Sequence, residues 1–239
     1  MTRFFALFVL LLVAACAGMA PRVEGVRTIG IVSAIGDKFY LRKVGFMVFG
    51  NESQEIAIDS WGIDELITAK IRAMLAGRFD VRPVKYRRAA FAEAENRLAI
   101  GVEPLRGETV RAEVTPQGLD AYLIVTKASA PYGQTNQMLT GLGMVQGFKF
   151  GDSIVYEYAF YTISLVDGHD WTLSRGTFAT VPGEAGLFGP RLKGASRDLD
   201  QTWWPASLDA ASNQRLKGVL LELIDQSLPG TLQKMQLVP

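Results

Sequence analysis

Cysteine and histidine are almost absent from this chain. Its 239 residues include one cysteine, Cys16, and one histidine, His169. One cysteine cannot form a disulfide within the chain, so apolar packing has to hold the fold together. Catalytic zinc normally has more than one histidine or cysteine ligand, and a nucleophilic serine needs a neighbouring base, for which His169 is the single histidine candidate. We therefore expect no catalytic residue, no metal site and no cofactor.

The surroundings of His169 favour a turn over a metal site. Asp167, His169 and Asp170 belong to the stretch DGHDW, which follows a run of strand-forming residues. Aspartate and glycine are selected in hairpin turns for backbone reasons. Three ligands on neighbouring turn residues could not converge on one ion without distortion. We interpret this stretch as the turn between two strands.

Phosphate-binding and nucleophile motifs are missing as well. The stretch GLGMVQG, residues 141–147, has the spacing GxGxxxG instead of the dinucleotide-binding GxGxxG, and we interpret it as a loop. No serine stands in a GxSxG elbow. The 25 basic and 24 acidic side chains nearly balance, and Arg87-Arg88 is the nearest approach to a basic cluster. We expect neither a nucleotide nor a nucleic acid as a partner.

Long apolar runs are limited to the beginning of the chain. Arg3 precedes a run of apolar residues at 4–13, and small residues follow at 14–18. This is the order of a secretory signal. The apolar stretch is shorter than the about 20 residues that a membrane-spanning helix needs. We expect the protein to be exported.

Residues 13–16, Val-Ala-Ala-Cys, resemble the lipobox of bacterial lipoproteins, which is an aliphatic residue, two small residues and a cysteine. The resemblance implies that residues 1–15 are a cleaved signal peptide, that Cys16 is lipidated, and that residues 16–25 are a short tether. Acyl chains on Cys16 would hold the protein on a membrane. Cleavage after Ala17 by an ordinary signal peptidase is the alternative.

The residues after Cys16 bear on the choice of membrane. In lipoproteins of well-studied enteric bacteria, an aspartate directly after the cysteine retains the protein on the inner membrane. Here Ala17 and Gly18 follow. We expect a location on the periplasmic face of a bacterial membrane, with the outer membrane favoured.

Hydrophobic periodicity predicts helices interleaved with strands. Ile63 and Ile67 share one face of a helix that Asp59 or Ser60 could cap and Gly77 could end. We expect helices at residues 58–77, 87–99, 107–114 and 213–228, the last ended by Pro229-Gly230. We expect strands at residues 26–34, 38–49, 79–85, 119–129, 153–166 and 171–181, the first two paired as a hairpin.

This order of elements predicts the fold class. It is an α/β (α+β) two-layer sandwich, in which a mixed sheet with antiparallel hairpins is covered by amphipathic helices. Residues 26–239 are expected to form a single globular domain, because no internal repeat or linker divides them.

Three stretches carry a resemblance to a group of envelope lipoprotein domains: IDELITAKIRAML as a helix, and DVRPV and GLDAYLIV as strands. With the lipoprotein signal and the terminal helix, their order is similar to that in the amino-terminal domain of the Tol-system translocation protein, the curli secretion lipoprotein and the lipoproteins that activate penicillin-binding proteins. The resemblance implies a small α/β domain that docks onto other envelope proteins and does not catalyse. It carries over no functional residue.

Residues 131–151 form a glycine-rich stretch with many apolar side chains and one charge, Lys149. Loops of this length are often functional, and flexible methionine-rich surfaces adapt to partners. The stretch either folds back into the core or contacts a partner or a membrane. The residues that we select as candidates for a partner contact are Met138, Leu142, Met144, Phe148 and Phe150.

Trp203 and Trp204 stand in a second stretch, SRDLDQTWWPASLD, which we expect to be non-helical. Exposed tryptophans are typical binding anchors, but the pair could also seal the domain beneath the last helix. Our leading hypothesis is a non-catalytic binding or scaffold domain for another envelope protein. The alternatives are a peptidoglycan- or glycan-binding module that uses the two tryptophans, and an enzyme with carboxylates not yet identified.

Overall fold

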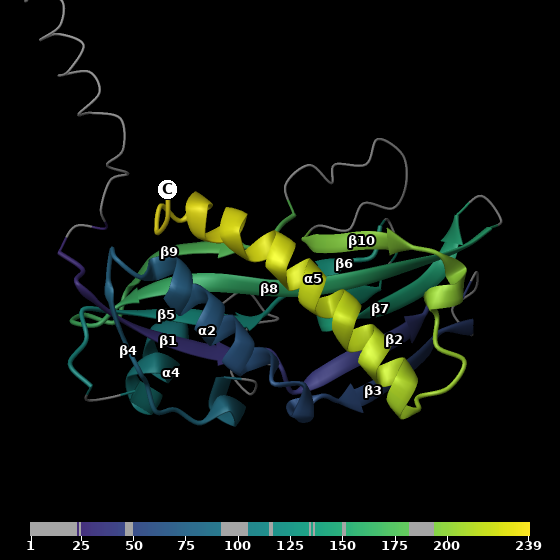
Figure 1. Ribbon diagram of the computed structural model, residues 1–239, viewed down its shortest axis with the longest axis horizontal. Helices are drawn as coiled ribbons and strands as arrows, with labels where there is room; N and C mark the ends of the chain where they lie inside the picture. Colours follow the sequence, from purple (N-terminus) through teal and green to yellow (C-terminus); the bar gives the residue numbers. More distant parts are fainter. Residues whose placement is uncertain are drawn as a thin grey trace, which may run out of the picture.

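A ten-stranded mixed sheet with helices packed on it makes up the fold (Figure 1). The computed structural model describes residues 23, 25–45, 50–91, 105–114, 117–133, 135, 137–149, 152–181 and 194–239. Cys16, Phe150 and most of the helix expected at residues 87–99 lie outside the described residues. None of the helices in the described ranges has the length and apolar character needed to span a membrane.

The described elements follow the predicted alternation of strands and helices. The helices are η2 Asp59–Trp61, α2 Ile63–Leu75, α4 Leu105–Val114, η3 Gln201–Trp203 and α5 Ala210–Lys234. The strands are β1 Thr28–Ala34, β2 Lys38–Lys43, β3 Glu52–Ala57, β4 Asp80–Arg82, β5 Ala121–Lys127, β6 Ser129–Pro131, β7 Met138–Lys149, β8 Asp152–Asp167, β9 Leu173–Phe178 and β10 Ala195–Leu199.

Strand β8 runs through the whole sheet and has a pair of strands on each edge. On one edge, residues 152–160 of β8 pair with β7 and residues 161–167 pair with β5. The other edge pairs with β9 and then with β10. β1 lies parallel to β5, and β2 lies parallel to β7. On both edges of β8, one neighbouring strand therefore gives way to another at the level of Phe160 and Tyr161. We call this level the junction.

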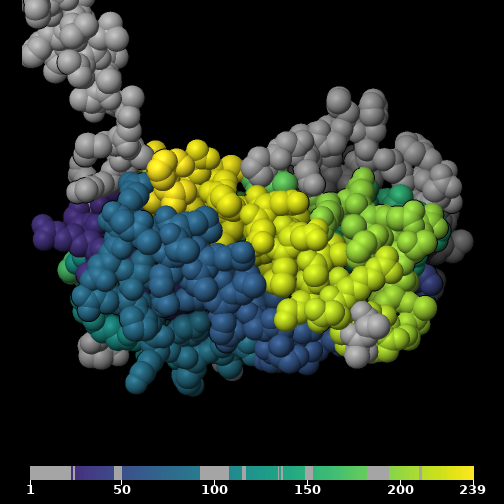
Figure 2. Space-filling view, viewed as in Figure 1, coloured from purple at the N-terminus to yellow at the C-terminus, as the bar shows by residue number. Residues whose placement is uncertain are grey.

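The helices divide the core between the two faces of the sheet. α2 and α5 lie across one face (Figure 1) and cover much of it in the space-filling view (Figure 2). They bury the largest apolar cluster, which includes Ile31, Ile67, Leu142 and Leu223. On the opposite face, residues of α4 pack against the β1–β5 half in a second cluster. A third cluster, rich in tyrosine and phenylalanine, lies on the β7–β8 half. The predicted fold class is confirmed.

The first predicted hairpin is wrong. β1 pairs in parallel with β4 and β5, and the hairpin is formed by β2 with β3, which the sequence analysis did not expect. All residues of β1 after Thr28 are buried, on both faces of the sheet, as is typical of a central strand of a parallel ladder. Helix α2 is confirmed, but Gly62 and not Asp59 or Ser60 stands at its N-cap.

The predicted loop at residues 131–151 is also wrong, because β7 is an interior strand between β2 and β8. Its glycines explain the error. A Cβ at Gly143 would lie 2.5 Å from the hydroxyl of Tyr158, and one at Gly147 would overlap the hydroxyl of Tyr132. The glycines leave room for aromatic rings that lie across the strand, whereas in a sequence they indicate a turn.

The last helix continues past Pro229, which was expected to end it. α5 extends to Lys234, with Pro229 exposed inside it. Leu228 and Leu232 are completely buried on its core side. Their packing supports the helix beyond the backbone hydrogen bond that proline cannot make, because most helical stability in proteins comes from tertiary contacts.

We predict that Gly143→Ala lowers the free energy of unfolding by about 1–3 kcal/mol, the usual cost of an extra methyl group in a packed interior. The new Cβ would meet both the Tyr158 ring and the carbonyl oxygen of Tyr40. Urea unfolding measures the change. Gly218→Ala is the matched control: Gly218 is exposed in α5 with no atom within 4 Å of a Cβ, so the variant should gain up to about 1 kcal/mol. Equal stability of the two variants would contradict the role given to Gly143.

Candidate functional site

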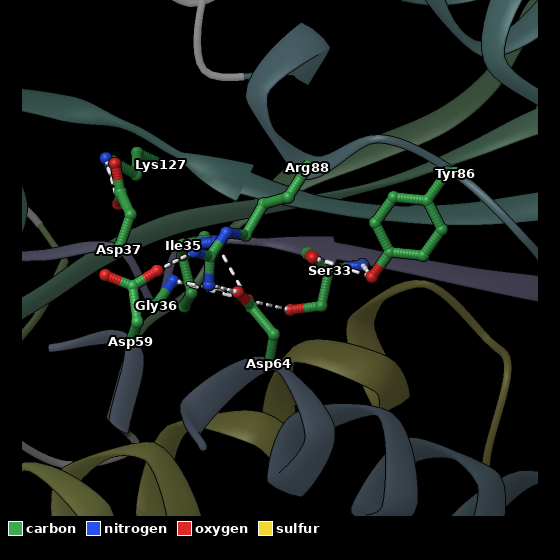
Figure 3. A network of polar contacts seen from close by, with 9 residues as sticks. All are labelled: Ser33, Ile35, Gly36, Asp37, Asp59, Asp64, Tyr86, Arg88 and Lys127. Carbon is green, nitrogen blue, oxygen red and sulfur yellow. Dashed lines mark hydrogen bonds and ion pairs between the residues drawn. The ribbon is translucent and has the colours of Figure 1, made fainter. Parts of the chain in front are cut away.

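A buried carboxylate binds the chain where it leaves β1 and turns towards β2 (Figure 3). Asp64 lies in the first turn of α2 and points at the chain where it leaves β1. Its carboxylate accepts hydrogen bonds from the Ser33 hydroxyl at 2.7 Å, the Ile35 amide at 2.9 Å and the Gly36 amide at 3.2 Å. Burial raises the pKa of Asp64, and these hydrogen bonds act against that rise. The carboxylate thus holds α2, β1 and the start of β2 together.

Further polar contacts surround Asp64. Arg88 binds both Asp64, at 3.3 Å, and the exposed Asp59. The Tyr86 hydroxyl donates to the carbonyl oxygen of Ser33 at 2.8 Å and accepts from its amide at 3.0 Å. Each polar group of this cluster already has a partner, so the cluster acts as a structural fastening and we assign it no chemical step.

The same cluster continues across the junction to β5. Lys127, the last residue of β5, is almost completely buried, and its ammonium lies 2.5 Å from Asp37 in the turn before β2. This ion pair bridges the ends of β1 and β5 at the level where both strands stop. Three acidic residues, Asp37, Asp59 and Asp64, therefore meet here, each opposite a cation.

A hollow of about 330 Å³ opens beside Asp64, between α2 and the chain after β4. Two carboxylates, Asp64 and Glu65, and two guanidinium groups, Arg72 and Arg82, line it. Its charges balance, so they favour no class of ligand.

The surface that best fits a binding function is a groove of about 560 Å³ at the other half of the sheet, which we call the Trp204 groove. One wall comes from β2 and β3 and the other from the chain between η3 and α5. Its lining combines apolar and polar side chains, as binding sites do. The lining residues are Leu41, Lys43, Glu52, Ser53, Gln54, Trp204, Pro205, Ala206, Ser207 and Leu208.

The two tryptophans have different environments. Both are partly buried against the main core, as the sealing interpretation expected. The guanidinium of Arg215 on α5 lies 3.8 Å from the centre of the Trp203 ring, so one face of that ring is covered. Trp204 instead lines the groove. Asp200 and Asp209 cap η3 and α5, which fixes the chain that carries the tryptophans.

Strand β3, which forms one wall of the groove together with β2, lies at an open edge of the sheet. It ends the strand order, and within the described ranges no strand pairs with its outer side. Glu52, Ser53, Gln54 and Glu55 are all exposed. Lys38 lies 2.6 Å from Glu55, and this exposed ion pair keeps the edge close to neutral. The sequence analysis missed this wall because it missed β3.

The candidate residues of β7 do not form one surface. Leu142 and Met144 are completely buried in the main core, whereas Met138 and Phe148 are about half exposed and lie near opposite ends of the strand. Phe150 is outside the described residues, as is Cys16.

His169 lies in the turn between β8 and β9, as predicted. Asp167 accepts a hydrogen bond from the His169 amide at 2.7 Å, and the imidazole lies 3.8 Å from Asp120. Among the described residues there is no group of three or more acidic, histidine or cysteine side chains placed to hold a metal ion.

Comparison with known proteins gives no family for this chain. No family model matches it, and no curated protein is similar to it. Among solved structures, lipoprotein GNA1162 from Neisseria meningitidis is similar at 13% identity and a TM-score of 0.28, over 85% of this chain and 99% of that one. Protein XCC0632 from Xanthomonas campestris, of the DUF330 family, is similar at 11% identity and a TM-score of 0.32, over 90% and 94% of the two chains. At such TM-scores neither likeness supports an argument about this chain.

We predict that Asp64→Ala lowers the free energy of unfolding by about 3 kcal/mol, because it removes three hydrogen bonds to a carboxylate and leaves Ser33 and two amides buried without a partner. Asp59→Ala is the control, since Asp59 also binds Arg88 but is exposed, and it should cost less than about 1 kcal/mol. Urea unfolding of both variants is the measurement. Similar losses in the two variants would show that Arg88, and not the backbone of β1, is the important partner.

Proposed function

We propose that this protein is a bacterial envelope lipoprotein whose domain binds another envelope protein and does not catalyse. The observation that carries the proposal is the Trp204 groove, because a hollow with an aromatic wall lies directly beside an exposed sheet edge. The sequence features of export and of lipidation at Cys16 supply the location, on the periplasmic face of a membrane, with the outer membrane favoured.

The position of the groove suits a tethered domain. The chain enters the domain just before β1, where Asp120 accepts hydrogen bonds from the amides of Arg27 at 2.9 Å and Thr28 at 2.8 Å. In Figure 1 this entry lies at the left end, and β3 and the chain after β10 lie at the right end. A domain held by Cys16 would thus present the groove away from its attachment.

The kind of partner follows from the edge of β3. An edge strand offers backbone N–H and C=O groups to an added strand, and neighbouring pockets select alternate side chains of that strand. Here the hollow beside β3 would receive such side chains between β2 and Trp204. We therefore propose that an extended segment of the partner pairs with β3.

Binding of a glycan is less well supported. A sugar-binding platform would use the faces of both tryptophan rings, but Arg215 covers one face of Trp203. Only Trp204 of the pair lines the groove.

We predict that Cys16→Ser moves the protein from the membrane to the soluble fraction. Without the thiol no acyl chain can be attached, and the apolar anchor is lost. Cell fractionation and the intact mass of the purified protein measure the change, and the wild type should carry the added mass of its acyl chains. An unchanged distribution, or a wild-type mass without acyl chains, would contradict the proposed anchor.

We predict that Ser53→Arg abolishes recovery of a stoichiometric partner from detergent-solubilised envelopes, because a long charged side chain would fill the Trp204 groove. Ser60→Arg is the matched control: Ser60 is exposed and does not line the groove, so this variant should still recover the partner. Trp204→Ala should also weaken recovery, by about tenfold or more if Trp204 is a binding anchor.

A second assay separates the two classes of ligand. If the wild type binds isolated murein sacculi and Ser53→Arg does not, the groove takes a glycan and the proposed protein partner is wrong. If both arginine variants recover the same partner as the wild type, the partner binds elsewhere on the domain.

A further inference from the structure

Glu157 is a completely buried carboxylate in the middle of β8. Its exposed fraction is 0%, and it faces α5, on the same side of the sheet as Val155 and Ala159. Within the described part of the chain, neither carboxylate oxygen has a hydrogen-bond partner. Burial raises the pKa of Glu157 to about 8, and the neighbouring Arg197 acts against that rise.

Arg197 lies opposite Glu157 on β10 and is bound mainly to α5. The two residues are register partners, and their nearest side-chain atoms, Nη2 and Oε2, are 3.5 Å apart. The guanidinium donates to Glu222 at 3.1 Å and to the carbonyl oxygen of Val219 at 2.9 Å. Its buried Nε has no acceptor among the described residues. Arg197 thus ties β10 to α5.

The unpaired polar atoms of Glu157 and Arg197 have complementary geometry. Nε and Nη2 of a guanidinium form a fork that fits the two oxygens of a carboxylate. Once ionised, Glu157 offers two free acceptors, and Arg197 has a free Nε donor beside the Nη2 that already approaches Glu157. A small rotation of the guanidinium would therefore form a two-bond pair with Glu157 through Nε and Nη2. Nη2 is the atom that now donates to Val219, and the same rotation would carry Nη1 away from Glu222.

We propose that Glu157 and Glu222 compete for Arg197, and that ionisation of Glu157 draws the guanidinium into the core and releases the tie between β10 and α5. Glu222 is 67% exposed, so solvent weakens its attraction for Arg197 more than it weakens that of the buried, ionised Glu157. The charged groups that act on Glu157 in the described structure are Arg197 from β10 and Glu222 from α5, and its neighbour on β7 is the apolar Met144.

The release would reach the Trp204 groove, and this consequence rests on the proposed function. β10 leads through η3 directly to Trp204, and α5 holds the same stretch through Arg215, which contacts Trp203 and the carbonyl oxygen of Thr202. Alkaline pH would loosen one wall of the groove while β2 and β3 stay in place.

The direction of the pKa shift of Glu157 determines how the stability of the fold changes with pH. The folded protein holds the Glu157 proton more tightly than the unfolded chain, in which glutamate has its ordinary pKa near 4.5. Stability that Glu157 retains at low pH is therefore lost as the pH rises from about 4.5 to about 8. Glu157→Gln should remove this part of the pH dependence, which urea unfolding of both proteins at several pH values measures.

Methyl NMR of the full-length protein in detergent tests the competition directly. Met144 is the register partner of Glu157 on β7, so its methyl signal is used to report the ionisation of Glu157. The carbonyl oxygen of Val219 accepts from Arg197, so the Val219 methyl signals are used to report the departure of Arg197. We expect both signals to shift with one midpoint near pH 8, and neither to shift in Glu157→Gln. If Met144 titrates and Val219 does not, Glu157 ionises without moving Arg197 and the proposal is wrong.

Removal of the competitor is the second test, and it remains informative if Glu157→Gln does not fold. Glu222→Gln should move the Met144 midpoint to lower pH, because Arg197 is then free to stabilise the ionised Glu157. The shift should persist in about 0.5 M salt, which screens the field of an exposed charge but not a buried pair. Glu65→Gln, at an exposed site on α2, is the control and should leave the midpoint unchanged.

The partner assay separates this proposal from the proposed function. Both NMR tests work without a partner, so they stand or fall on Glu157, Arg197 and Glu222 alone. Where a partner is recovered, its binding should weaken between pH 6.5 and pH 9 for the wild type and not for Glu157→Gln. If partner binding weakens equally in the wild type and in Glu157→Gln, the contact of Arg197 with α5 does not control the Trp204 groove.

Discussion

The fold depends on the continuity of β8. This strand runs from Asp152 to Asp167, while the strands on both of its edges stop and restart at the level of Phe160 and Tyr161. Its ladders keep the two halves of the sheet in one register, and a slip of one residue would turn every core side chain to the wrong face. Tyr161 is completely buried at this level and shares a hydrogen bond of 2.8 Å with Ser227, so α5 is fixed to the sheet at the same point.

Buried polar residues connect the helices to the sheet on both sides of the junction, and they do so in two ways. Asp64 is buried but has its hydrogen bonds filled by β1 and by Arg88. Glu157 is buried as deeply, yet its oxygens face a guanidinium that is bound elsewhere. A fully satisfied buried network specifies one arrangement, whereas unpaired buried polar atoms are costly and gain from an arrangement that pairs them. The satisfied network, around Asp64, lies at the β1–β5 half of the sheet. The partly satisfied one, around Glu157, lies on the half that leads to Trp203 and Trp204.

The sequence was sufficient where local pattern and tertiary environment agree, and insufficient where they differ. The repeat of Ile63, Ile67 and Ile71 predicted α2 because the helix buries one face, and the apolar run of β5 predicted a buried strand. β7 was missed because its glycines make room for the rings of Tyr132 and Tyr158, and this packing, with Tyr158 on the neighbouring strand β8, is visible only in the folded structure. β3 was missed because an exposed edge strand, ESQEIA, has no apolar alternation. Of the groove, the sequence predicted the tryptophan wall and could not predict which strand would face it.

An edge of the sheet and a hollow coincide, in the described structure, at β3. β10 is bound to α5 through Arg197, and β4 is only three residues long. β3 is longer, exposed and flanked by the Trp204 groove. The proposed tether, residues 16–25, would reach at most about 35 Å if fully extended, so a protein attached through Cys16 would meet partners near its own membrane. Because the groove lies at the end away from the tether, a partner bound there would be held at the far side of the domain from that membrane, and lengthening the tether would change its reach without changing the groove.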